Sequence, residues 1–205
     1  VRSIAEALEG VADGSTVLIG GFGSVGQPDA LIEGLIEQGA RDLVCVANNA
    51  GGGRVGLAKL IELGRLRRMI CSFPRTADSV VFEEVYRAGK IELELVPQGT
   101  LAERMRAAGA GIPAFFTKTG VGTMVADGKE LREFDGETFV MERSLVPEVS
   151  LVKAYRADKS GNLQFRYTAR NFNPTVAMAG KIAVVEVDEI VETGAMVPHQ
   201  VHLPV

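Results

Sequence analysis

Short apolar runs alternate with amphipathic segments through the first half of the chain. The apolar runs are predicted as strands at residues 16–20, 43–47, 66–72 and 91–96. The amphipathic segments are predicted as helices at 3–8, 28–38, 57–63 and 79–88. Strands that alternate with helices form βαβ units, so this pattern favours a parallel sheet. Where the apolar run is continuous rather than alternating, as at 16–20 and 43–47, the strand is expected to be buried on both faces.

The pattern changes after Gly109. Glycine and threonine are dense at 120–123, and short stretches of period 2 follow at 138–142 and 150–155. Alternation with that period is typical of strands with one exposed face. We interpret the region from about 110 to 165 as an antiparallel or mixed β section inserted into the fold.

A parallel-type strand is predicted again at 181–187, where the chain is mostly apolar. No internal repeat, low-complexity linker or charge block divides the chain. The expected fold is therefore α/β: an open, mainly parallel sheet with flanking helices and the inserted β section, in a single domain over residues 1–205. A domain of this length buries roughly 70% of its unfolded surface.

The composition argues against binding to nucleic acid or to a membrane. Hydrophobic residues make up 46% and charged residues 23%, with a formal net charge of −4. That balance offers no basic surface for nucleic acid or an anionic membrane, and no apolar run approaches the length of a membrane span. Cys45 and Cys71 lie inside predicted strands and are expected to be reduced core thiols. A cytoplasmic location is expected on that basis.

A glycine-rich loop at 20–28 follows the first strand and opens a helix. It contains Gly-x-Gly-x-x-Gly at Gly21, Gly23 and Gly26, the spacing of dinucleotide-binding loops. That fingerprint also needs an acidic residue at the end of the second strand, where this chain has Asn48 and Asn49. A dehydrogenase-like nucleotide module is therefore only a distant alternative. The loop does offer backbone N–H groups that a ligand can approach closely.

Seven blocks of sequence, taken in order, carry a resemblance to a known family. They lie at 20–28, 48–51, 95–104, 108–113, 119–123, 169–173 and 184–192. In these blocks the chain resembles the α subunit of family I CoA-transferases, including Gly-Gly-Phe at the strand exit followed by Gly-x-Pro. The resemblance extends over nearly the whole chain.

The resemblance implies a ping-pong transfer of CoA between carboxylic acids. CoA and succinyl-CoA would be substrates, with a 3-oxo acid as acceptor, no bound cofactor and no metal. The family's nucleophile is a glutamate in a Ser-Glu-Asn-Gly motif on the β subunit, and this chain lacks that motif. An obligate β-subunit partner is therefore expected, and this chain would supply positioning and charge stabilisation.

The resemblance also implies roles for individual residues. Asn48 would donate its carboxamide N–H to the oxyanion of a tetrahedral intermediate. Gln98 would contact the carboxylate of the acid substrate, just before Thr100, which is expected to cap a helix. Asn49 would fasten its loop at the substrate site. Without the resemblance, turn formation would explain the two asparagines better.

The loop glycines have two interpretations of comparable weight. In one, Gly20, Gly21 and Gly23 provide backbone donors near the acyl group. In the other, they only allow the turn between strand and helix.

The segment 71–75 indicates which 3-oxo acid would accept CoA. In this segment the chain departs from the Ser-Tyr-Val-Gly-Glu-Asn stretch of members that act on ketone bodies, and is similar to members that handle 3-oxoadipate. Arg75 would bind the second carboxylate of 3-oxoadipate, because arginine pairs bidentately with carboxylates. A solvated surface arginine is the other interpretation. The alternatives for the whole chain are a subunit specific for acetoacetate, and a binding homologue without catalysis.

Overall fold

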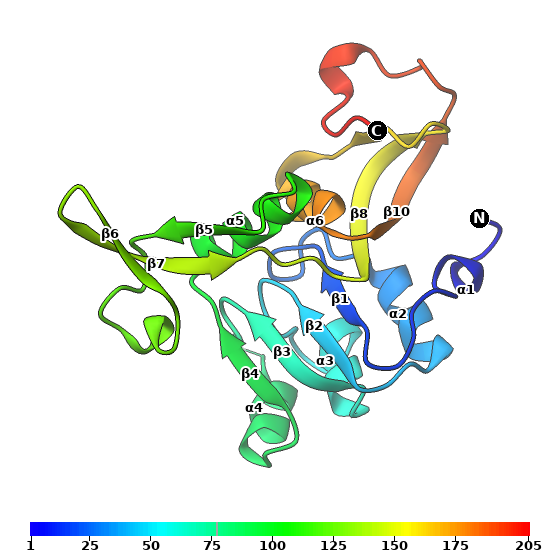
Figure 1. Ribbon diagram of the computed structural model, residues 1–205. Coiled ribbons are helices and arrows are strands. Elements are labelled where there is room, and N and C mark those ends of the chain that lie inside the picture. The colour runs from blue at the N-terminus through cyan, green and yellow to red at the C-terminus, as the bar shows by residue number, and fades with distance from the viewer. Residues whose placement is uncertain (77) are drawn as a thin grey trace.

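A parallel sheet forms the centre of the molecule in the computed structural model, which describes residues 1–76 and 78–205. Its strand order is β10-β8-β1-β2-β3-β4, and every neighbouring pair on this path is parallel (Figure 1). The short strand β9 pairs antiparallel with β8. The strands are β1 Thr16–Ile19, β2 Leu43–Val46, β3 Leu66–Cys71, β4 Glu92–Leu95, β8 Val149–Asp158, β9 Leu163–Gln164 and β10 Ile182–Val191. The parallel sheet predicted from the alternating pattern is confirmed.

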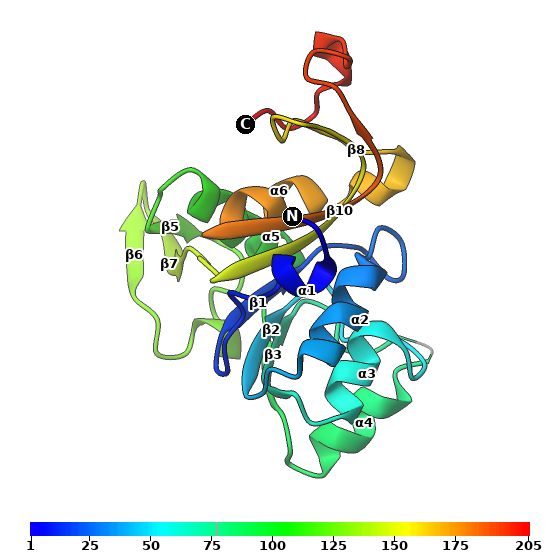
Figure 2. The ribbon, with the colours of Figure 1, turned by 90° about the vertical axis from the view of Figure 1, so that its right-hand side faces the viewer.

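Helices cover both faces of this sheet (Figure 2). The α-helices are α1 Ile4–Ala7, α2 Asp29–Gln38, α3 Gly56–Glu62, α4 Val80–Arg87, α5 Gln98–Gly109 and α6 Asn173–Ala179. Single 3₁₀ turns occur at η1 Met124–Ala126, η2 Tyr167–Arg170 and η3 Pro198–Gln200. Helices α2, α3 and α4 pack in one hydrophobic cluster with the sheet, and α5 and α6 pack in another.

The two clusters follow from the pleat of the strands. In β1, Val17 and Ile19 belong to the cluster under α2 and α3, whereas Leu18 belongs to the cluster under α5 and α6. Successive side chains of a strand point to opposite faces, so an apolar run supplies both clusters at once. Each fully buried Leu or Ile of this kind contributes about 1.5–3 kcal/mol relative to an exposed side chain. Strand β4 differs, because it is at the edge of the sheet and Leu95 is exposed.

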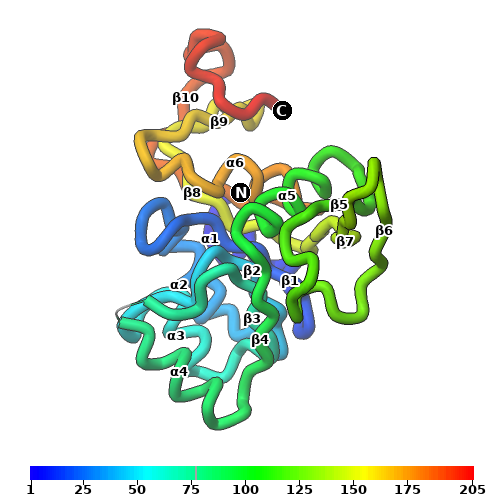
Figure 3. Tube along the Cα trace, turned by 90° about the vertical axis from the view of Figure 1, so that its left-hand side faces the viewer, coloured from blue at the N-terminus to red at the C-terminus, as the bar shows by residue number. Residues whose placement is uncertain are grey.

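A small antiparallel sheet stands beside the main one. Its strands β5 Ala114–Thr117, β6 Leu131–Phe134 and β7 Glu137–Arg143 have the order β5-β7-β6. Phe134 packs edge-on against Phe116 and Phe139, with both centroid distances 5.4 Å. Figure 3 shows this sheet beside α5. The Arg104 guanidinium on α5 donates to the carbonyl oxygen of Arg143, which ties the small sheet to the main body.

The prediction for 150–155 was wrong. These residues were expected in the inserted β section, but they lie in β8, an inner strand of the main sheet that pairs parallel with both β1 and the edge strand β10. Strand β8 has a polar residue, Lys153, between buried Val152 and Ala154, and this produced the apparent alternation. The Lys153 ammonium reaches the carboxylate of Asp188 on β10, 2.6 Å away, so its charge is paired beside the sheet.

Both cysteines are buried, unpaired thiols, as predicted. Burial raises the pKa of the Cys71 thiol to about 12, so it stays protonated at neutral pH. None of the helices in residues 1–76 and 78–205 combines the length and the apolar character that a bilayer span requires.

Candidate functional site

A cavity of about 450 Å³ opens at the carboxyl ends of β1, β2 and β3. The chain segments that leave these strands, together with the start of α5, contribute its lining residues. They are Phe22, Gly23, Asn48, Asn49, Ser72, Phe73, Thr76 and Gln98. The strand order reverses here, because β2 lies on one side of β1 and β8 on the other. Ligands of open α/β sheets bind at such reversal points.

Asn48 is held by hydrogen bonds on both its backbone and its side chain. Its carbonyl oxygen accepts from the N–H groups of Ser72 and Phe73, which continue the pairing of β2 with β3. Its Oδ1 accepts from Gln98 Nε2 at 2.8 Å and from Ser72 Oγ at 2.7 Å. Among the residues that the structure describes, none accepts a hydrogen bond from Asn48 Nδ2. The buried Asn48 therefore has an unused N–H₂ group at the cavity.

Gln98 is the first residue of α5, where it meets Asn48 across 50 positions of sequence. The expectation that Thr100 caps this helix was wrong. Pro97 holds the capping position, and Thr100 is inside the first turn, with a buried hydroxyl that has no partner among the described residues. The helix begins earlier because Pro97 has the fixed φ, −51°, that suits a helix entry.

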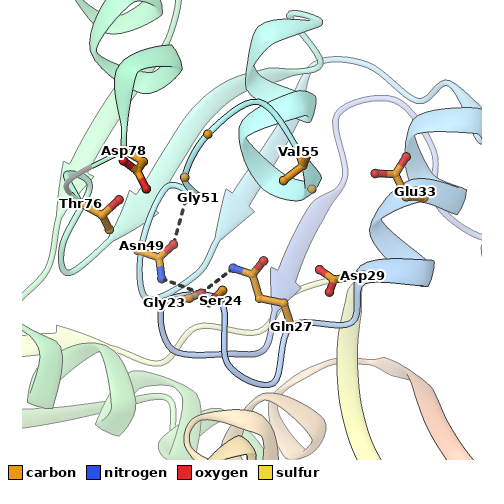
Figure 4. A pocket seen from close by; sticks show the side chains of 13 residues that line it. Gly23, Ser24, Gln27, Asp29, Glu33, Asn49, Gly51, Val55, Thr76 and Asp78 are labelled. Carbon is orange, nitrogen blue, oxygen red and sulfur yellow. Dashed lines mark hydrogen bonds between the residues drawn. The ribbon is translucent and has the colours of Figure 1, made fainter.

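Asn49 fastens two loops together. Its Oδ1 accepts from the N–H of Gly51 at 2.8 Å, and its Nδ2 donates to the carbonyl oxygen of Gly23 at 3.3 Å. Gln27 donates to the same carbonyl oxygen at 2.8 Å (Figure 4). Both ends of the Asn49 amide are thus engaged within the protein, although the residue also lines the cavity.

The glycine loop is clamped from outside by Asn173, which is fully buried. Asn173 Nδ2 donates to the carbonyl oxygens of Gly26 and Ala169, and its Oδ1 accepts from the N–H of Lys153, each at 2.9 Å. The Oδ1 also faces Gly20 so closely that a Cβ on Gly20 would overlap it. Close packing, rather than a positive φ, is thus the reason for glycine at position 20.

The structure separates the three candidate glycine donors. The N–H of Gly20 donates to the carbonyl oxygen of Leu151 in the sheet, so the prediction of a ligand donor there was wrong. Gly21 and Gly23 have φ of 115° and 61°, values that favour glycine. Their N–H groups have no acceptor among the described residues, and Gly23 lines the cavity.

Replacing Gly20 by alanine is expected to destabilise the fold by about 1–3 kcal/mol, the usual cost of forcing a methyl group into a packed site. The added Cβ must displace Asn173 and loosen its bonds to the loop. Urea unfolding measures the effect. Gly10→Ala is the matched control, because a Cβ at Gly10 has no neighbour within 4 Å. An unfolding midpoint of Gly20→Ala equal to that of the unmodified protein would refute the claim that close packing against Asn173 requires glycine at position 20.

Arg75 is placed apart from this cluster. Its side chain is 73% exposed, and its Nε pairs with the Glu83 carboxylate on α4 at 2.6 Å. Glu83 also pairs with Arg87 at 3.1 Å. Arg75 does not belong to the lining of the Asn48 cavity. Its role toward a substrate carboxylate stays a prediction, and would require it to leave Glu83.

A second cavity of about 690 Å³ adjoins the first and shares Gly23, Asn49 and Thr76 with it. Its other lining residues are Ser24, Gln27, Asp29, Glu33, Gly51, Gly52, Gly53, Val55, Gly56 and Asp78 (Figure 4). Burial raises the pKa of Asp29, and the nearby Glu186 carboxylate adds to the effect. Neither cavity has a lysine or arginine among its described lining residues.

Sequence reasoning missed the contributions of Ser72, Asn173 and the two aromatics, Phe22 and Phe73. Ser72 directly follows β3, as Asn48 nearly follows β2, so the strand-end rule could have found it. Asn173 does not follow a parallel strand, so the strand-end rule could not find it. Its contacts with Gly20 and Gly26 span about 150 positions of sequence. Phe22 and Phe73 are 50% and 57% exposed and form an apolar rim beside the amides.

The cavity is suited to binding an uncharged or anionic oxygen through amide N–H groups. Among the described residues no group of three or more His, Cys, Asp or Glu side chains could hold a metal ion. His202, one of the two histidines, accepts a hydrogen bond from the N–H of Phe165 and fixes the C-terminal segment.

Comparison with known proteins gives one family. The model of the family described as Coenzyme A transferase matches residues 1–205. A 3-oxoadipate CoA-transferase subunit of Pseudomonas putida is 55% identical, over 99% of this chain and 88% of its own. A succinyl-CoA:3-ketoacid coenzyme A transferase subunit of Xanthomonas campestris is 56% identical, over 97% of this chain and 81% of its own.

Solved structures share the fold. Glutaconate coenzyme A-transferase from Acidaminococcus fermentans has a TM-score of 0.86 at 20% identity, covering 99% of this chain and 72% of its own. The acyl-CoA transferase YdiF from Escherichia coli has a TM-score of 0.85 at 23% identity. This chain is matched in full but spans 44% of the YdiF chain.

Proposed function

Because the chain belongs to the Coenzyme A transferase family, we propose that it is the α subunit of a succinyl-CoA:3-oxoacid CoA-transferase whose acceptor is 3-oxoadipate. The family assignment excludes the dehydrogenase-like alternative, which the missing ribose-binding acid already disfavoured. We further propose a cytoplasmic location, which the two free thiols support.

The observation that carries the proposal is the Asn48 carboxamide. Its oxygen is occupied by Ser72 and Gln98, and its N–H₂ group is left without a partner among the described residues. A fixed amide donor of this kind stabilises negative charge that develops on a carbonyl oxygen during acyl transfer. The N–H groups of Gly21 and Gly23 would add backbone donors on the neighbouring loop.

The proposed reaction begins with a glutamate carboxylate of the β subunit, which attacks the thioester carbon of succinyl-CoA. The carbonyl oxygen becomes an oxyanion, and its collapse breaks the C–S bond to give CoA thiolate and a glutamyl–succinyl anhydride. The thiolate then attacks the glutamyl carbonyl carbon, the anhydride C–O bond breaks, and succinate leaves. The acceptor carboxylate reverses these steps and takes CoA, so one difficult exchange becomes several easier ones.

In this division of work the chain contributes donors rather than a nucleophile. Asn48 would bind each oxyanion, and Gln98 would hold the carboxylate of the acid substrate through N–H donation. Asn49 would keep the two loops in place around the substrate. The cavity needs a partner to complete it, because the Ser-Glu-Asn-Gly motif does not occur in this sequence.

Acetoacetate is the second candidate acceptor. The described linings of both cavities lack a cationic side chain, so they suit an acid without a second carboxylate. A relative named for 3-ketoacids and one named for 3-oxoadipate are about equally similar to this chain, at 56% and 55% identity. The deciding experiment is CoA transfer from succinyl-CoA by the αβ complex, with 3-oxoadipate and acetoacetate compared by kcat/KM. A preference for acetoacetate would overturn the proposed acceptor.

Arg75→Ala in that complex is expected to lower kcat/KM for 3-oxoadipate about tenfold and to leave acetoacetate almost unchanged. A charge-assisted hydrogen bond is worth about 1.5–3 kcal/mol, and leaving Glu83 offsets part of it. Arg87→Ala serves as the control, because Arg87 pairs with the same glutamate on the exposed side of α4. Equal losses with both acids would show that Arg75 does not read the second carboxylate.

A further inference from the structure

The two ends of an asparagine carboxamide have almost the same shape but opposite polarity. Nδ2 carries two donors, whereas Oδ1 only accepts. An Asn48 that presented Oδ1 to the substrate would repel the oxyanion it is proposed to stabilise. The protein must therefore select one of two orientations of a buried side chain.

Two donors converge on Asn48 Oδ1. Gln98 Nε2 donates to it at 2.8 Å. The Ser72 hydroxyl lies 2.7 Å from Oδ1 and 3.1 Å from the backbone carbonyl oxygen of Asn48, and its single proton is donated to the nearer acceptor, Oδ1. A carbonyl oxygen has two lone pairs, and these two bonds use both. Turning the amide by 180° would bring Nδ2 against Gln98 Nε2, a donor facing a donor. The arrangement thus favours the orientation with Nδ2 toward the cavity.

We propose that Ser72 is a positioning residue for CoA transfer, which acts by holding the Asn48 carboxamide with its N–H₂ group toward the reacting carbonyl. This inference rests on the proposed function. Ser72 is itself well fixed, since its backbone N–H donates to the carbonyl oxygen of Asn48 at 3.2 Å. Its hydroxyl makes the shorter of the two bonds to Oδ1, and it reaches Asn48 from the end of the neighbouring strand, β3.

The first test compares single variants in the αβ complex. Ser72→Ala is expected to lower kcat about tenfold, the factor that corresponds to 1.4 kcal/mol, with little change in KM. Ser72→Thr keeps the hydroxyl and is expected to restore most of the rate. Ser144→Ala is the matched control, because the Ser144 hydroxyl donates to a backbone carbonyl oxygen at an exposed position outside both cavities. Thermal unfolding of each variant shows whether the fold is kept.

The second test combines Ser72→Ala with Asn48→Ala. If Ser72 acts through Asn48, the double variant is no slower than Asn48→Ala alone, because residues of one network are not additive. Additive losses would overturn the proposal and indicate that Ser72 works independently. Full activity of Ser72→Ala in an active complex would also overturn it, while the proposed function stands. A complex of the unmodified chains that transfers no CoA would instead refute the proposed function itself.

Discussion

Asn48→Ala in the αβ complex is expected to lower kcat by about 10²–10³ and to leave KM almost unchanged, as is found when one oxyanion donor is lost. The reason is the state of the amide: its oxygen is occupied by Ser72 and Gln98, and its N–H₂ group has no partner within the described residues. Such a donor is already oriented before the reaction. Its hydrogen bond to the substrate therefore strengthens most when negative charge develops on the carbonyl oxygen. Steady-state kinetics with succinyl-CoA measure the loss.

Asn162→Ala provides the comparison for this variant. Asn162 is a hydrogen-bonded amide in the turn between β8 and β9, where it contacts Asp158 and lines neither cavity. Its replacement is expected to leave kcat close to that of the unmodified complex. If Asn48→Ala instead raised KM and kept kcat, Asn48 would be a residue that binds the ground state, and its role as an oxyanion donor would be wrong.

Local patterns predicted the first two strands of the sheet because both faces of β1 and β2 are buried. Val17, Leu18 and Ile19 alternate between the two clusters, which makes the apolar run visible without any long-range information. The same reasoning failed at β8. There Lys153 interrupts the run, and its pairing with Glu186 and Asp188 on the neighbouring strand makes that charge acceptable beside a buried sheet.

The meeting of Asn48 with Gln98 was predictable from the strand-end rule and the family resemblance. Both residues follow parallel strands, and the carboxyl ends of such strands meet at one edge. Which acceptor each individual donor binds was not predictable from the sequence. The N–H of Gly20 is used by Leu151, and the Arg75 guanidinium by Glu83. These contacts depend on how separate segments of the chain pack together in space. They therefore produce no periodic pattern in the sequence.

The isolated chain is expected to show no CoA transfer, and the β subunit is expected to restore it. The cavity offers amide donors from Asn48 and Gln98, but its described lining contains no glutamate, and the family's nucleophile motif is not in this sequence. A stabilised oxyanion requires a nucleophile to form it, so donors alone give no turnover. A β subunit whose motif glutamate is replaced by glutamine provides the control, because it should bind this chain without restoring transfer.

The most direct measurement locates the covalent intermediate. The αβ complex is incubated with succinyl-CoA without an acceptor, and the mass of each intact subunit is then determined. We expect a CoA adduct on the β subunit, lost when an acceptor acid is added, and no adduct on this chain. A CoA adduct on this chain, or full transfer by this chain alone, would contradict the claim that it positions substrates and stabilises charge for a nucleophile on its partner.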